Sequence, residues 1–506
     1  MQPQSLRKSS RWVFAGTVLS RPIQMVSIVV LARMLGPDGF GVVALVTSTA
    51  ITLYAIVNVG LAEASNKYVA EFYSEDPLGA ARYSSTIVTI VLGLSVICFI
   101  ALWFLRRHWA YSVFPWTTPQ TTIALCLVLA WLNLLFALLS SLLSAVQLFR
   151  EVTLLAIAQS ALLLICVAFL GPTGVNGAVV AYVCAAALPI LFAVKVLWSF
   201  DARLLGFPSF SKLADLKRIF HFSMPIWLGA LTLNPALTFT YAYLARQSGG
   251  SHELGLFNTA NGLRMLMVIL PGVLMVVVTP ALIQRGGQYG NTDSYDELLN
   301  KAVSVVLFLT LPLLVPVLLL SDLIFVVYGR AFSESSRLFI PLVAAAAVAA
   351  LGTPLLSVLV AKNKTWWSFG FGIAKSVVLV VLALWWVPRF LSMGLSLSVM
   401  ISEMLFYFVA LEYCIRISAA PRSMRWPFYG CSVVIGILVA LAMSLPQVTR
   451  AIMVVPLTYV VAAALIRIYP LLGQWLAELA PPRLRDPALW LIRVITARNL
   501  WPARSR

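Results

Sequence analysis

Long apolar runs, each near the length that crosses a bilayer, recur along the whole chain and constrain its fold more than any other feature. A transmembrane helix needs ~20 mostly apolar residues, and continuous runs favour helices over the alternating pattern of a β-barrel. Of the 506 residues, 61% are hydrophobic and 11% are charged, whereas a soluble domain has ~45–50% and ~25%. Water-soluble classes are therefore excluded. We expect an all-α, polytopic membrane protein of about fourteen transmembrane helices, at 12–34, 40–64, 84–105, 121–147, 152–171, 174–198, 220–245, 255–283, 300–328, 336–361, 365–387, 391–415, 426–445 and 450–468.

The charged residues predict how the chain is oriented. Lys and Arg number 36 against 18 Asp and Glu, a formal net charge of +18. Most of these cations fall on the same side as the N-terminus, which the positive-inside rule makes cytoplasmic; Arg106 and Arg107 depart from this pattern. We expect a multi-pass membrane protein with both termini in the cytoplasm. The excess charge indicates contact with anionic membrane lipids and not with nucleic acid.

Short segments in the first half of the chain recur in the second. "LAR" at 31–33 returns at 244–246, "FGVV" at 40–43 aligns with "LGLF" at 254–257, and "AIAQS" at 156–160 aligns with "GIAKS" at 372–376. These matches predict two six-helix lobes in a parallel repeat, with a central site between them; chance similarity of apolar sequence is the alternative. The expected division is an N-lobe at 1–198, a cytoplasmic linker at 199–219, a C-lobe at 220–416, two added helices at 417–469 and a basic tail at 470–506. The tail suits an amphipathic interfacial helix, or a disordered basic segment.

Four ionisable residues fall near the middle of predicted spans: Arg21, Arg264, Lys375 and Glu403. Each costs ~2.5–3.5 kcal/mol at the bilayer centre, so each is a candidate functional residue. The three cations predict a lumen that binds an anion such as a diphosphate, through bidentate Arg and point-charge Lys contacts. Alternatives remain open: Arg264 can snorkel to the outer face, Lys375 can pair with Glu403, and Glu403 can couple transport to protons or sodium.

Amide side chains within the spans are candidates for a sugar path, because sugar hydroxyls need hydrogen-bonding partners. Ordinary hydrogen bonding between helices is the alternative reading of each one. These residues are Gln24, Asn58, Asn133, Gln159, Asn234 and Asn261. The six cysteines lie singly in apolar runs, so we predict no metal site, and nothing in the sequence indicates a cofactor.

One turn between the first two predicted spans carries a family signature. Residues 31–50 resemble the polysaccharide flippases of the multidrug/oligosaccharidyl-lipid/polysaccharide (MOP) exporter superfamily, whose "R-x-LGP-x-x-FG" pattern is matched by Arg33, Leu35, Gly36, Pro37, Phe40 and Gly41. Segments 59–73, 327–342 and 355–365 are similar to later parts of the same family.

The resemblance implies a function as well as a fold. It implies transport of an undecaprenyl-diphosphate-linked oligosaccharide to the outer leaflet of the bacterial plasma (inner) membrane by alternating access, for O-antigen, capsule or exopolysaccharide. Coupling to a proton or sodium gradient is expected by analogy, and a polymerase and a chain-length regulator are expected partners. A MATE-like drug or metabolite antiporter is the alternative, disfavoured because span 1 carries Arg21 where the drug exporters typically have acidic residues in the first lobe. A membrane enzyme of polysaccharide assembly is less favoured, since the outer loops are short and no nucleophile–His pair is evident.

Overall fold

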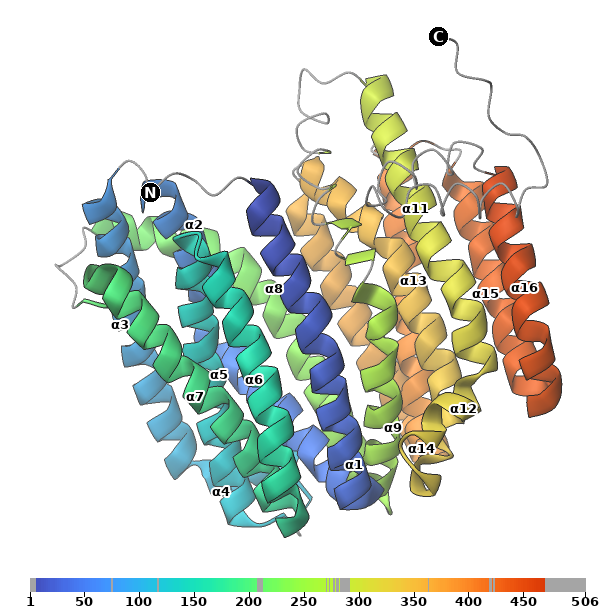
Figure 1. Cartoon of the computed structure of the whole chain (residues 1–506), viewed down its shortest axis with the longest axis horizontal. Helices are drawn as coiled ribbons and strands as arrows, with labels where there is room; N and C mark the ends of the chain where they lie inside the picture. Colours follow the sequence, from blue (N-terminus) through green and yellow to red (C-terminus); the bar gives the residue numbers. More distant parts are fainter. Residues whose placement is uncertain are drawn as a thin grey trace. The chain divides into compact units, whose positions relative to one another are not determined.

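The computed structural model is helical throughout the residues that it describes (Figure 1). These are 6–73, 76–115, 118–206, 213–269, 292–362, 364–417 and 424–468, with Pro421 and scattered residues between 271 and 282. Among them, nine helices are long and apolar enough to cross a membrane. The expected all-α polytopic membrane fold is therefore confirmed. The predicted tail at 470–506 lies outside the described residues.

Two compact units divide the chain, and the first comprises Met1–Asn258 with Val380–Leu395. In it, α1 packs against α5, α6, α7 and α8, while α2 packs against α3 and α5. Its helices are α1 (Leu6–Asn58), α2 (Leu61–Tyr73), α3 (Pro77–Phe104), α4 (Arg106–Val113), α5 (Gln120–Ala145), α6 (Phe149–Leu170), α7 (Val175–Asp201) and α8 (Leu213–Ala245), with 3₁₀ turns at Gly171–Thr173 and Ala202–Leu205.

The second unit comprises Thr259–Leu379 and Ser396–Arg506. Here α11 packs against α13 and α16, and α13 packs against α15. Its helices are α11 (Thr292–Leu319), α12 (Ser321–Val326), α13 (Ser335–Ala361), α15 (Arg425–Ser444) and α16 (Gln447–Ile468), with a 3₁₀ turn at Arg330–Phe332; α9 (Gly250–Arg264) and α14 (Thr365–Arg416) have residues in both units. The lobe boundaries predicted above stay a prediction.

The two longest helices each contain a break in the backbone. In α1 the break is at Gly36, with φ 66° and ψ 177°, and in α14 it is at Leu391, with φ 48° and ψ −127°. Glycine suits the first break because its missing Cβ allows a positive φ. Each long helix therefore contains two predicted spans, 12–34 and most of 40–64 in α1, and 365–387 and 391–415 in α14.

The predicted end of the second span is wrong by several residues. The span expected at 40–64 ends at Asn58, because Val59 and Gly60 both take positive φ and start a new helix, α2. The Asn58 carboxamide oxygen accepts the Ala62 backbone N–H at 3.2 Å, and its nitrogen donates to Glu63 at 3.1 Å. Asn58 therefore caps α2, a use of Asn that satisfies an orphan N–H at a helix start.

Cations and aromatic rings join α2 to α3 and α8. Tyr68 of α2 stacks on Tyr83 of α3 with ring centroids 5.4 Å apart, and the Arg218 guanidinium lies 5.1 Å from the Tyr68 ring. Arg218 also pairs with Glu71 at 2.8 Å. These contacts combine ring packing with cation–π attraction. The segment 59–73 therefore packs as a helix that joins α3 and α8.

Two helical segments that the predicted repeat aligns lie against each other. Asp38 and His252, 214 residues apart, approach to 3.1 Å. The same offset relates Pro37 to Ser251 and Gly41 to Gly255. A Cβ on Gly41 would meet the Ser251 backbone, and a Cβ on Gly255 would meet the Pro37 backbone. The contact is reciprocal, as expected where two equivalent elements meet across a local two-fold axis.

Candidate substrate cavity

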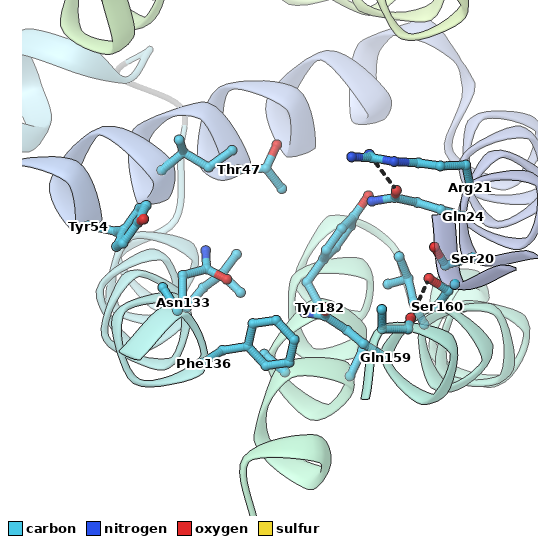
Figure 2. Close-up of a pocket in the computed structure, with 18 of the residues that line it drawn as sticks. Ser20, Arg21, Gln24, Thr47, Tyr54, Asn133, Phe136, Gln159, Ser160 and Tyr182 are labelled. Carbon is cyan, nitrogen blue, oxygen red and sulfur yellow. Dashed lines mark hydrogen bonds between the residues drawn. The ribbon is translucent and has the colours of Figure 1, made fainter. Parts of the chain in front are cut away.

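A cavity of about 750 Å³ lies inside the first unit, lined by residues of α1, α5, α6 and α7 (Figure 2). Its size falls within the ~300–1,000 Å³ range of small-molecule sites. Four of the predicted site residues line it: Arg21, Gln24, Asn133 and Gln159. They come from three different helices, so the fold brings together residues up to ~140 positions apart in the sequence.

Arg21 is the one charged residue among the lining residues that the structure describes. Its Nη1 donates to the Oε1 of Gln24 at 3.3 Å, since residues three apart on a helix share a face (Figure 2). A guanidinium has five N–H donors and this contact uses one. The remaining donors suit an anionic ligand, and Gln24 helps to hold the group in place.

Unpartnered amides and phenols face the same space. In the described part of the chain, the Asn133 and Gln159 carboxamides and the Tyr54 and Tyr182 hydroxyls make no hydrogen bond, and all four residues line the cavity. Polar groups of native proteins are usually hydrogen-bonded to protein or water. These groups are therefore free to bind a ligand rich in hydroxyls.

Hydroxyl side chains along the wall are used differently. Ser160 donates to the Ala156 carbonyl at 2.9 Å, and Thr153 of α6 donates to the Trp12 carbonyl of α1 at 2.9 Å. Their protons are committed to the backbone, while their oxygens keep acceptor capacity. The Thr153 bond also fixes α6 against α1 beside the cavity.

Lys375 and Glu403 form a largely buried ion pair within the second unit. Lys375 Nζ lies 2.6 Å from Glu403 Oε1, and their side chains are 17% and 10% exposed. The Lys375 ammonium also lies 5.5 Å from the Phe406 ring centre. The pairing left open by the sequence is thus present, and it neutralises the charge of Lys375. The predicted roles of this lysine in diphosphate binding and of Glu403 in coupling stay predictions.

The other predicted residues do not line this cavity. Arg264 is 7% exposed and its Nε donates to the Asn261 carboxamide oxygen at 2.5 Å, both near the end of α9. Asn58 caps α2, and Asn234 lies in α8. Tyr54, Phe136 and Tyr182 also line the cavity, although the sequence did not predict them as site residues. No sequence signal separates these aromatic residues from the many that face lipid.

The model of the family described as "Polysaccharide biosynthesis protein" matches residues 6–285, more than half of the chain. The chain belongs to this family. The comparison of this chain with curated proteins found no match.

Solved structures of MOP-superfamily proteins have the same fold. The lipid II flippase MurJ in an inward closed conformation is 13% identical, with a TM-score of 0.67, and the match covers 90% of this chain and 98% of that one. An inward-facing multidrug resistance MATE family transporter is 18% identical, with a TM-score of 0.64, and the match covers 79% and 95%. A MOP superfamily transporter from Pyrococcus furiosus is 16% identical, with a TM-score of 0.58 and coverage of 81% and 94%. At these identities the likeness establishes the fold, and it agrees with the family assignment.

Proposed function

We propose that this protein moves an undecaprenyl-diphosphate-linked oligosaccharide across the bacterial plasma membrane by alternating access, for synthesis of a surface polysaccharide. The main supporting observation is the cavity of the first unit, which Arg21 lines together with the amides of Asn133 and Gln159, and these amides have no hydrogen-bond partner among the described residues. A guanidinium binds phosphate oxygens through parallel hydrogen bonds. Amides and phenols supply the donors and acceptors that sugar hydroxyls need. One cavity therefore offers chemistry for both parts of the head group.

The family and the fold support the same proposal from another direction. The family is one of polysaccharide biosynthesis, and one protein of the same fold is described as a lipid II flippase. We assign the chain as a transporter and not an enzyme on these grounds. A membrane protein of this family acting on a lipid-linked sugar unit would meet the substrate within the bilayer, where its apolar helices lie.

A MATE-like drug or metabolite antiporter is the second candidate, since proteins of that description share the fold. Export of an organic cation calls for negative charge where the cation binds. The lining residues that the structure describes include no carboxylate and do include Arg21. The charge of the cavity therefore favours an anionic substrate.

The proposal includes an orientation and partners. The distribution of Lys and Arg favours cytoplasmic termini and contact with anionic lipids. We also propose that a proton or sodium gradient drives the transport, and that a polymerase and a chain-length regulator receive the flipped unit. O-antigen, capsule and exopolysaccharide are all compatible fates.

The test is complementation of a bacterium from which the gene has been deleted. Arg21→Gln removes the cavity's charge with little change of volume, so surface polysaccharide should fall at least about tenfold, because a charge-assisted hydrogen bond contributes ~1.5–3 kcal/mol. The matched control is Arg107→Gln, an exposed arginine of α4 outside the cavity, which should export normally. Membrane abundance is measured for each variant. Normal export by an abundant Arg21→Gln protein would overturn the proposal.

A further inference from the structure

The cavity has two chemically different walls. Arg21, Gln24 and Ser20 lie at one side of it, on the part of α1 before the Gly36 break (Figure 2). Tyr54, on the part after the break, lies at the other side with Asn133 and Phe136 of α5 (Figure 2). The first group is named the cationic wall and the second the aromatic wall.

Charge restricts which part of a lipid-linked substrate each wall can hold. The aromatic wall carries no ionisable group at neutral pH, since a tyrosine has a reference pKa of ~10. The desolvated diphosphate needs the positive charge of the cationic wall. The diphosphate therefore belongs beside Arg21.

The aromatic wall fits a sugar ring. A pyranose has apolar C–H faces that pack on aromatic rings and a rim of hydroxyls that need hydrogen bonds. Phe136 and Tyr54 provide the rings, while Asn133 provides an amide without a partner in the described structure. Phe136 follows Asn133 at a spacing of three on α5, so the two side chains lie on the same face of the helix.

Covalent connection then fixes which sugar is bound. The sugar nearest to the wall is the one attached to the diphosphate, and a cavity of about 750 Å³ has room for the head of the molecule and not for a long chain. We propose that Asn133 and Phe136 determine specificity by binding the sugar linked directly to the diphosphate. This inference rests on the proposed function.

Binding by the purified protein in detergent micelles tests the division. The probes are farnesyl diphosphate without a sugar, and farnesyl diphosphate linked to a single glucose, galactose or N-acetylglucosamine. Phe136→Leu and Asn133→Leu should each weaken binding of the preferred sugar-bearing probe about tenfold, and leave binding of farnesyl diphosphate within about twofold. Arg21→Gln should weaken binding of both kinds of probe.

Controls separate a local effect from misfolding. Phe169→Leu, at an exposed position of α6, makes the same change outside the cavity and should bind every probe normally. Asn133→Gln keeps the amide and should recover part of the sugar-dependent affinity.

The outcomes are distinguishable. If the aromatic-wall variants affect both kinds of probe equally, or neither kind, while Arg21→Gln weakens both, the two-wall inference is wrong and the proposed function stands. If Arg21→Gln weakens neither kind, the proposed function itself fails.

Discussion

At the residue scale, Arg21 and Lys375, two cations of the predicted spans, differ in whether a neighbouring carboxylate neutralises their charge. Lys375 lies 2.6 Å from the Glu403 carboxylate in a buried pair, whereas Arg21 faces a cavity and contacts the neutral Gln24. A neutralised charge attracts an incoming anion far less than an unneutralised one. Arg21 is therefore the cation on which the proposed diphosphate contact depends, and the Lys375–Glu403 pair is better suited to holding the two parts of α14 together.

This difference predicts how the pair responds to mutation. Lys375→Met should lower the melting temperature in detergent by several degrees, because breaking a buried pair leaves an uncompensated charge at a cost of ~3–5 kcal/mol. The double variant Lys375→Met/Glu403→Gln removes both charges and should recover most of that loss, with export retained. A stable double variant that no longer exports would contradict a structural role and place the pair in the transport cycle.

Charges and amides could be predicted from the sequence, and the aromatic residues of the cavity could not. Arg21 and Gln159 are conspicuous because a polar group in an apolar run carries an energetic cost. Phe136 and Tyr182 carry no such cost, and aromatic residues make up 11% of the chain. Only the packing of α1, α5, α6 and α7 shows which aromatic residues face the cavity.

At the element scale, the structure depends on two turns that hydropathy locates only roughly. The break at Gly36 was expected from the "LGPDGFG" segment, whereas the helix end at Asn58 was not, because apolar residues continue past Gly60. Asn58 was predicted as a path residue and acts as a helix cap, since its carboxamide bonds the first turn of α2. A periodic apolar pattern does not reveal a positive φ.

The reciprocal contact of Gly41 with Ser251 and of Gly255 with Pro37 gives a further prediction. Gly41→Ala and Gly255→Ala should each lower the melting temperature, because the added methyl groups would collide with the backbone at Ser251 and Pro37. Gly93→Ala is the matched control: it lies in helix α3 with no neighbour within 4 Å of an added Cβ. There the substitution should be neutral or stabilising by up to ~1 kcal/mol. Thermal unfolding in detergent measures the melting temperature of all three variants. Equal melting temperatures for the variants at positions 41, 255 and 93 would show that the segments around Gly41 and Gly255 are not in close contact.

At the scale of the whole molecule, family, fold and cavity chemistry are each compatible with the proposed substrate. The family is one of polysaccharide biosynthesis, and the fold is shared with MOP-superfamily transporters. In the described residues, the cavity combines one cation with amides that have no hydrogen-bond partner. The fold class could be predicted from hydropathy alone. The cavity required the structure, because its residues come from four helices spread over the first two hundred positions.

A flipping assay in proteoliposomes tests directly whether Arg21 is needed to move the lipid-linked oligosaccharide. Undecaprenyl-diphosphate-linked oligosaccharide extracted from the deletion strain is labelled fluorescently, and an impermeant quencher reports the fraction in the outer leaflet. With wild-type protein or Arg107→Gln, nearly all of the labelled lipid should become accessible to the quencher. With Arg21→Gln, accessibility should stay at the level of protein-free liposomes, because the diphosphate has lost its cation. Flipping by Arg21→Gln at the wild-type rate would contradict a role of Arg21 in binding the diphosphate.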